Sequence, residues 1–245
     1  MSPEMSFLTT AEREALRQTM LVRGRLEEQF ENLDQQHQAA ALGMWVFLAT
    51  EVMFFGTLFL AVAVYRNLYP AAFECASAQL NWLIGGINTV VLLVSSLTIV
   101  LAVHHARHGR RDRIVLFLVL TALLGVCFLC LKGIEYYIDY REYLIPGWRF
   151  DPGPWVAERG LRPDQVPHVK LFLLLYWIMT GFHALHVTIG IAAVLAMLVL
   201  ARRDCFSPVY YAPVDVTALY WHFVDIVWIF LLPTLYLLGT HHLGQ

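Results

Sequence analysis

The chain has 245 residues, of which 58% are hydrophobic and 15% are charged, and its formal net charge is -2 at pH 7. Soluble domains are usually about 45–50% apolar and about one quarter charged, so this composition favours a polytopic membrane protein over a soluble enzyme. A net charge near zero gives no indication of a nucleic acid or another polyanion as a partner.

The N-terminal segment, residues 1–40, is polar and charged, and no secretory signal peptide is visible in it. Residues 9–38 are predicted to form a surface helix, because Thr9 and Glu12 fit a capping box and apolar residues recur at roughly helical spacing. We expect this helix to be solvated; packing on a neighbouring subunit is the alternative. The first apolar run must then direct insertion into the membrane.

Five apolar runs follow, each of about 20 residues or more, which is enough to cross a hydrocarbon core of about 30 Å. They lie at residues 42–65, 82–103, 114–137, 171–200 and 217–239. The sequence therefore predicts an all-α fold, a bundle of five transmembrane helices that occupies residues 41–245.

The arginines predict which ends of these helices face the cytoplasm. The short loop HHARHGRRDR between the second and third runs is rich in arginine, and further arginines lie in the N-terminal segment and after the fourth run. Short basic loops stay on the cytoplasmic side, so we expect the N-terminus inside and the C-terminus outside. The loop at 139–170 then lies outside. Its prolines and glycines exclude long helices, and Trp148, Phe150 and Trp155 are expected at the membrane interface or against a partner.

The small residues are expected to serve packing. Cys127 and Cys130 form a CxxC inside an apolar run, with no second pair to complete a zinc site, so we expect them between helices. Cys75 and Cys205 should lie on opposite sides of the membrane, which excludes a disulfide between them. Close helix packing is expected at four glycines: Gly85, Gly86, Gly181 and Gly190.

Glu51 is the most informative residue, because it stands alone in the first apolar run. A carboxylate inside a bilayer costs several kcal/mol unless another group meets it, so it marks a site or a partner. The other polar candidates come in pairs with i, i+3 spacing, which places each pair on one helix face. These pairs are Lys132 and Glu135, His183 and His186, and His222 and Asp225.

At about 1.5 Å per residue, Glu51, His222 and Asp225 share one layer on the order of 8–14 Å below the cytoplasmic surface. His183 and His186 join this layer if the long fourth helix is placed favourably. Lys132 and Glu135 belong near the opposite surface, where the Lys132 side chain could reach water. We expect the histidines to be structural and hydrogen-bonded, with no metal site; a haem held by histidines of two helices is the less favoured alternative.

Five segments, in order along the chain, resemble motifs of subunit III of the haem–copper cytochrome oxidases. They read ALGMWVFLATEVMFFG (41–56), INTVVLLVSSLTIVLAVHHA (87–106), LKGIEYY (131–137), MTGFHALHVTIG (179–190) and YWHFVDIVWIFL (220–231). The resemblance implies a subunit without a redox centre, since that family's haems and copper lie in subunits I and II. It also implies packing on subunit I, bound phospholipid, and support of proton uptake and durability during turnover. The family's carbodiimide-reactive carboxylate falls on Glu51.

The resemblance implies an aerobic respiratory, proton-pumping oxidase of the bacterial cytoplasmic membrane, with cytochrome c oxidase placed first. A quinol oxidase or the related subunit of a nitric oxide reductase is the alternative, and a larger respiratory supercomplex is a further possible setting. Many family members have seven helices, with lipids in a cleft beside the first two. This chain matches the last five, so we expect helices of another subunit, or lipid alone, to cover the exposed face.

Two roles for Glu51 remain open: organising structure and lipid, or passing protons towards subunit I. A stand-alone transporter or a haem-bearing anchor is least favoured, because the sequence has no internal repeat and no pair of broken helices.

Overall fold

The structure is a computed structural model that describes residues 32–147, 150–157, 159, 161–207 and 210–237, together with single positions at 9, 12, 15, 19, 29 and 30. Most of the predicted surface helix at 9–38, like Trp148, lies outside the described residues. Thr9 and Glu12 form the reciprocal hydrogen bonds of a capping box: the Glu12 carboxylate accepts from the Thr9 N–H at 2.8 Å, and the Thr9 hydroxyl accepts from the Glu12 N–H at 3.3 Å.

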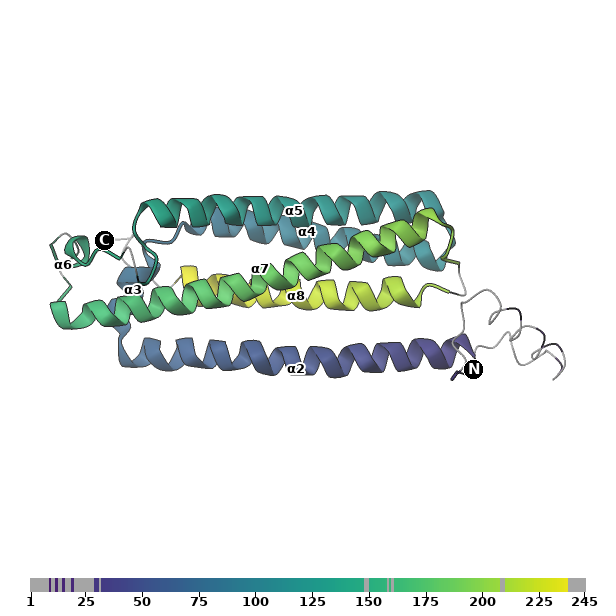
Figure 1. The fold of residues 1–245 in the computed structure, drawn as a ribbon, viewed down its shortest axis with the longest axis horizontal. Helices are drawn as coiled ribbons and strands as arrows, with labels where there is room; N and C mark the ends of the chain where they lie inside the picture. The colour runs from purple at the N-terminus through teal and green to yellow at the C-terminus, as the bar shows by residue number, and fades with distance from the viewer. Residues whose placement is uncertain are drawn as a thin grey trace.

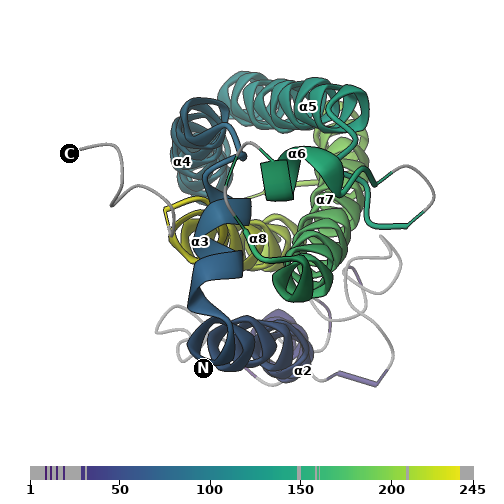
Figure 2. The same ribbon diagram turned by 90° about the vertical axis from the view of Figure 1, so that its left-hand side faces the viewer.

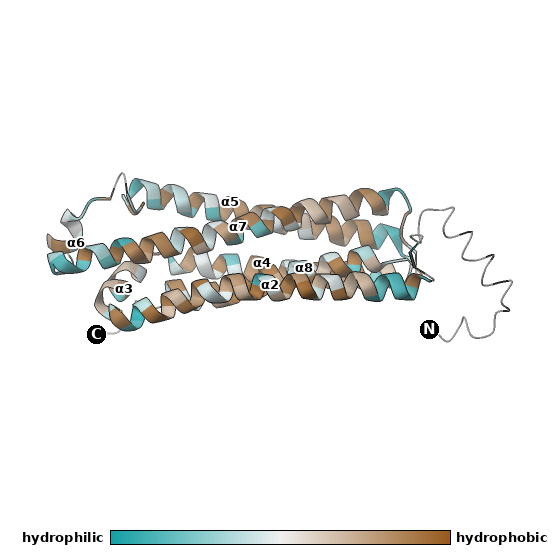
Figure 3. Cartoon of the chain, turned by 60° about the horizontal axis from the view of Figure 1, so that its bottom comes forward, coloured by the Kyte–Doolittle hydropathy of each residue, from teal (hydrophilic) through white to brown (hydrophobic). Residues whose placement is uncertain are grey.

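Five long helices dominate the fold, as predicted. They are α2 (Leu33–Leu68), α4 (Trp82–Arg107), α5 (Arg111–Arg141), α7 (Val166–Arg202) and α8 (Ala212–Tyr236). Each is long and apolar enough to cross a membrane. Apolar residues run through the middle of these helices and polar residues gather where they end (Figure 3). The first helix begins earlier than its apolar run, so residues 33–38 belong to α2 and not to a separate surface helix.

Four of the long helices form a ring, and the fifth lies on its side. Within the ring α4 packs on α5, α5 on α7, α7 on α8, and α8 on α4. α2 packs against α7 and α8 from outside the ring, as the end-on view in Figure 2 shows. All five run lengthwise beside one another (Figure 1). The fold is therefore a four-helix bundle with an attached fifth helix.

Trp221 of α8 joins the four helices of the ring. Its indole Nε1 donates to the hydroxyl of Ser95 on α4 at 3.0 Å. A Cβ atom at Gly125 of α5 would lie 2.7 Å from the indole ring, and one at Gly190 of α7 would lie 3.0 Å from it. The two glycines thus make room for the largest side chain of the core.

Only some of the other small residues that were expected to pack closely between helices do so. Gly85 approaches Leu232 of α8 closely, as Gly190 approaches Trp221, but Gly86 and Gly181 face open space. The expectation that all four glycines serve close packing is therefore wrong for two of them. Cys127 and Cys130 are also exposed on α5 and do not pack between helices, because the buried face of α5 is formed by other positions.

α2 buries a single narrow stripe against the ring. Leu48, Phe55 and Val62 are its buried residues, and their seven-residue spacing places them on one helix face. Most of its other large apolar side chains are exposed, for example Leu42, Met53 and Leu60. This helix therefore presents an exposed apolar surface that another subunit or lipid could cover, as expected for a face of the bundle.

The two ends of the bundle differ. At the end called here the arginine-rich end, short connections join α4 to α5 and α7 to α8, with Cys205 nearby. At the opposite end, called the capped end, the short helices α3 (Pro70–Ser77) and α6 (Gly153–Ala157) lie over the bundle (Figure 2). Cys75 is on α3, so the two cysteines lie at opposite ends, as predicted.

The connection at the capped end is shorter than the predicted loop at 139–170. α5 continues to Arg141 and α7 begins at Val166, after a 3₁₀ turn at Pro163–Gln165. Pro167 does not stop α7, because it lies in the first turn, where no preceding helical carbonyl meets the ring. Trp155 is 2% exposed and stacks on Phe150, so its side chain is buried within the cap and is not exposed to lipid.

Candidate functional site

Glu51 of α2 meets His186 of α7 midway along both helices. Its Oε2 lies 3.1 Å from the imidazole Nε2, and the two side chains are 18% and 12% exposed. The ring of Phe55, one helical turn further along α2, packs edge-on against the imidazole at 5.3 Å. The predicted partner of the lone carboxylate is thus a histidine of the same chain, shielded by an aromatic ring.

The hydrogen bond of the second imidazole nitrogen, Nδ1, determines how many protons lie in the Glu51–His186 contact. His186 Nδ1 lies 2.8 Å from the carbonyl oxygen of Phe182. A carbonyl only accepts, so Nδ1 must carry a hydrogen. Nε2 then either carries a second hydrogen, giving an imidazolium opposite a carboxylate, or accepts one from a protonated Glu51. In both cases one proton lies between the two residues.

His222 and Asp225 belong to a second group on α8. The hydroxyl of Ser96 on α4 lies 2.7 Å from His222 Nδ1 and also interacts with the Asp225 carboxylate. Asp225 is 4% exposed, and its Oδ1 has no hydrogen-bond partner among the described residues. Ser96 was not singled out from the sequence. The predicted layer is therefore two groups, Glu51 with His186 and Ser96 with His222 and Asp225; no hydrogen bond between described side chains joins them.

His183 does not join either group. It is 1% exposed and packs between the rings of Phe128 and Trp228, with ring centroids 5.5 and 5.1 Å away. Neither of its nitrogens has a hydrogen-bond partner within the described ranges. The expectation that each histidine is hydrogen-bonded is wrong here, because this residue points into the aromatic core of the ring of helices.

Lys132 does not reach water, contrary to the expectation from its depth. It is 2% exposed, and its Nζ donates to Glu135 at 3.1 Å, to the hydroxyl of Tyr176 at 3.2 Å and to that of Tyr236. Asp139 completes the group through a 2.9 Å contact with the Tyr176 hydroxyl. The aspartate was assigned to a loop, although its position seven residues after Lys132 places both on one face of a longer helix.

α2 is held to the ring at two further heights. At the arginine-rich end His37 lies 3.2 Å from Asp215 at the start of α8, which also pairs with Arg107 of α4 at 3.1 Å. At the capped end the rings of Tyr69 and His168 stack at 3.6 Å. Among the described contacts in which a histidine joins α2, or the residue directly after it, to the ring, Glu51–His186 is the middle one of three, and aromatic contacts such as Phe54–Phe182 and Phe59–Phe230 lie between them.

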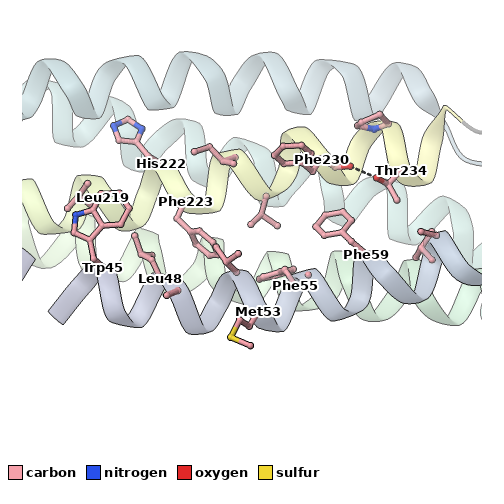
Figure 4. Close-up of a pocket in the computed structure, with 18 of the residues that line it drawn as sticks. Trp45, Leu48, Met53, Phe55, Phe59, Leu219, His222, Phe223, Phe230 and Thr234 are labelled. Atoms are coloured by element: carbon pink, nitrogen blue, oxygen red, sulfur yellow. Dashed lines mark hydrogen bonds between the residues drawn. The ribbon is translucent and has the colours of Figure 1, made fainter. Parts of the chain in front are cut away.

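An apolar groove with a volume of 1140 Å³ runs between α2 and α8 (Figure 4). On α2 its lining extends from Trp45 to Arg66, which at 1.5 Å per residue is about 32 Å, close to the thickness of a hydrocarbon core. His222 lines it near one end and Arg66 at the other. No carboxylate among the described residues pairs with Arg66.

The described residues bring no three His, Cys, Asp or Glu side chains together in a way that could hold a metal ion. The candidate site consists instead of paired polar groups inside a helical bundle and an apolar groove along its side. The fold, with its five long apolar helices, indicates a multi-pass membrane protein.

A family model described as cytochrome c oxidase subunit III matches residues 26–140 and 170–240. The chain belongs to this family. It is accordingly a subunit of a haem–copper terminal oxidase and works with other oxidase subunits.

Characterised relatives point to one branch of these enzymes. Quinol oxidase subunit 3 of Bacillus spizizenii is 31% identical over 204 residues, which cover 81% of this chain and 86% of the relative. The protein of the same name from Bacillus subtilis is 30% identical with the same coverage. Probable quinol oxidase subunit 3 of Staphylococcus haemolyticus is 27% identical over 84% of this chain and 92% of its own length. These names support the quinol oxidase alternative better than the cytochrome c oxidase placed first.

Proposed function

We propose that this chain is subunit III of a quinol-oxidising haem–copper terminal oxidase in the bacterial cytoplasmic membrane. The observation that carries the proposal is its similarity to quinol oxidase subunits 3 over more than four fifths of the chain. Subunit III packs on subunit I, the haems and copper belong to other subunits, and the N-terminus faces the cytoplasm.

The Glu51–His186 contact supports a role in proton handling. It holds one proton in the hydrocarbon layer. The proton on Nε2 gives an imidazolium opposite a carboxylate, and the proton on Oε2 gives two neutral groups, so it can move between the two atoms over a single hydrogen bond. We place this proton on the path by which subunit III supports proton uptake during turnover.

The groove supports a second role, the binding of phospholipid. The groove is about as long as the hydrocarbon core is thick, which is enough for acyl chains of both leaflets. Its lining is apolar, and the Arg66 guanidinium at its capped end suits the phosphate of a lipid headgroup. Lipid there would cover part of the apolar surface that α2 leaves exposed.

The electron donor tests the main proposal. The chain is tagged, the complex is extracted in mild detergent, and oxygen consumption is followed with quinol or with reduced cytochrome c. We expect a haem-containing complex that oxidises quinol and not cytochrome c. Oxidation of cytochrome c alone would contradict the proposal, and reduction of nitric oxide without oxygen consumption would favour the reductase alternative.

The lipid role is tested separately by counting the phospholipids that stay bound to the complex in native mass spectrometry. Arg66→Gln should lose phospholipid. Arg162→Gln, at an exposed arginine of the capped end that pairs with Asp164, is the matched control and should not. Equal lipid content in both variants would exclude a lipid headgroup at Arg66.

A further inference from the structure

A buried polar cluster lies at the capped end of the ring of helices. The number of hydrogens that its hydrogen bonds require points to a proton-binding site. The cluster comprises Lys132, Glu135 and Asp139 of α5, Tyr176 of α7 and Tyr236 of α8, all nearly inaccessible to solvent. None of these side chains faces the Glu51–His186 contact or the groove, so the proposed function leaves the cluster without a role.

Lys132 is the cation of the cluster. Its Nζ contacts three acceptors, Glu135 Oε2 and the two tyrosine hydroxyls, which is the number of hydrogens on an ammonium group. Four aromatic rings also lie 4.9–5.3 Å from Nζ, those of Tyr136, Tyr176, Trp228 and Tyr236. Such rings stabilise a desolvated cation.

The remaining contacts need one hydrogen more than the lysine and tyrosines supply. Glu135 Oε1 lies 2.6 Å from the Tyr236 hydroxyl and 3.0 Å from that of Tyr176, and the Tyr176 hydroxyl lies 2.9 Å from Asp139 Oδ2. These three contacts have only the two hydroxyl hydrogens between them, because the lysine hydrogens are used elsewhere. A carboxyl group must therefore supply the third.

Asp139 is the carboxyl group that carries it. Glu135 forms an ion pair with the Lys132 ammonium at 3.1 Å and accepts from the Tyr236 hydroxyl at 2.6 Å. Asp139 makes no direct contact with the ammonium, and its only hydrogen bond within the cluster is to Tyr176. When Asp139 is protonated, it donates to the Tyr176 hydroxyl, and the Tyr176 and Tyr236 hydroxyls both donate to Glu135. Each of the three contacts then contains one hydrogen.

We infer that Asp139 is a proton-binding site in the capped half of the bundle, which holds one proton while Lys132 and Glu135 form an ion pair. The buried cluster is then electrically neutral, whereas an ionised Asp139 would leave one uncompensated charge in a low-dielectric region. The charged and titratable groups that surround it are Lys132 and Glu135 of α5, Glu142 directly after α5, Tyr176 of α7 and Tyr236 of α8. Asp139 lies two residues before the end of α5 and, at 3% exposed, is the most exposed member of the cluster, so its proton would exchange with the water beyond the capped end.

Infrared spectroscopy of the whole oxidase complex at neutral pH tests this inference. A protonated carboxylic acid has a carbonyl band separate from those of carboxylates and amides. Asp139→Asn should lose one such band, and Glu142→Gln, at an exposed carboxylate outside the cluster, should retain it. Tyr176→Phe should keep the band but shift its frequency, because the acid loses its acceptor.

Wild-type complex labelled with ¹³C at the aspartate carboxyl covers the case in which a variant fails to assemble. The band should then shift with the isotope in the unmodified protein, and Asp225→Asn shows whether the other buried aspartate contributes. An acid-carbonyl region that is the same in Asp139→Asn and wild type, or that does not respond to the aspartate label, would overturn the inference.

Discussion

The carboxylate of Glu51 on α2 and the imidazole of His186 on α7 lie 3.1 Å apart and share one proton. The Phe182 carbonyl accepts the hydrogen of His186 Nδ1, so the proton of the Glu51–His186 contact lies either on Nε2 or on the Glu51 carboxyl group. The same contact holds α2 to the ring of helices between the His37–Asp215 and Tyr69–His168 contacts. The Glu51–His186 hydrogen bond therefore both contributes to the position of α2 against the ring and holds the shared proton.

Replacement of the histidine should change the reactivity of Glu51 towards a hydrophobic carbodiimide, which attacks a protonated carboxyl group. In His186→Gln the base is lost, so the proton has to reside on Glu51 in the membrane. We expect the yield of modified Glu51, measured by mass spectrometry of its peptide, to rise several-fold. Glu51→Gln is the control without a reactive group, and a lower yield in His186→Gln would contradict the shared proton.

The packing around Trp221 predicts unequal effects of one substitution at two positions of α5. In Gly125→Ala the new methyl group would lie 2.7 Å from the indole ring, so we expect a loss of about 1–3 kcal/mol. In Gly133→Ala the methyl group has nothing within 4 Å. Thermal unfolding of the purified complex should show a lower Tm for the first variant only. Equal Tm values would mean that the glycine does not determine the packing.

The sequence predicts the fold well because membrane helices leave a strong signal, about twenty apolar residues for each crossing. The arrangement of polar groups is less predictable, because it depends on which way each side chain points. Depth grouped Glu51 with His222 and Asp225 and added His186 only on condition of a favourable helix position, whereas the hydrogen bond of Glu51 is to His186. Depth placed Lys132 near water, whereas its buried contacts come from Tyr176 and Tyr236, which are distant in the sequence and carry no charge to draw attention.

The helix ends predicted from the sequence differ from those in the structure for a related reason. The helices extend beyond the hydrocarbon core, where polar residues such as Asp139 continue the helix although the apolar run has ended. A loop predicted from apolar runs is therefore too long, and any site residue in the last helical turn is assigned to it.

The predicted orientation can be checked with the two cysteines at opposite ends of the bundle. In variants that retain a single cysteine, a membrane-impermeant maleimide should label Cys205 in inverted vesicles and Cys75 in right-side-out vesicles. A variant that retains only Cys127, which is exposed on α5 within the apolar span, should be labelled in neither. The reverse pattern for Cys75 and Cys205 would place the N-terminus outside.

The reactivity of Cys75 should depend on pH in a shifted range. Burial raises the pKa of this thiol above its usual value, and the nearby Arg159 partly opposes the effect. The thiolate is the reactive form, so alkylation at neutral pH should be slower than for an ordinary thiol and should rise to its maximum at higher pH. Arg159→Gln removes the opposing charge and should slow the reaction further; a faster reaction would contradict this interpretation.

The central claim, that the proton held by Glu51 and His186 supports turnover of the oxidase, is tested most directly by the durability of Glu51→Gln. The amide retains size and hydrogen bonding but cannot give up a proton to His186. The complex should assemble with its full haem content and begin at a nearly normal rate of quinol oxidation, but lose activity after several-fold fewer turnovers than wild type. A Glu51→Gln complex that lasts as many turnovers as wild type would contradict the claim.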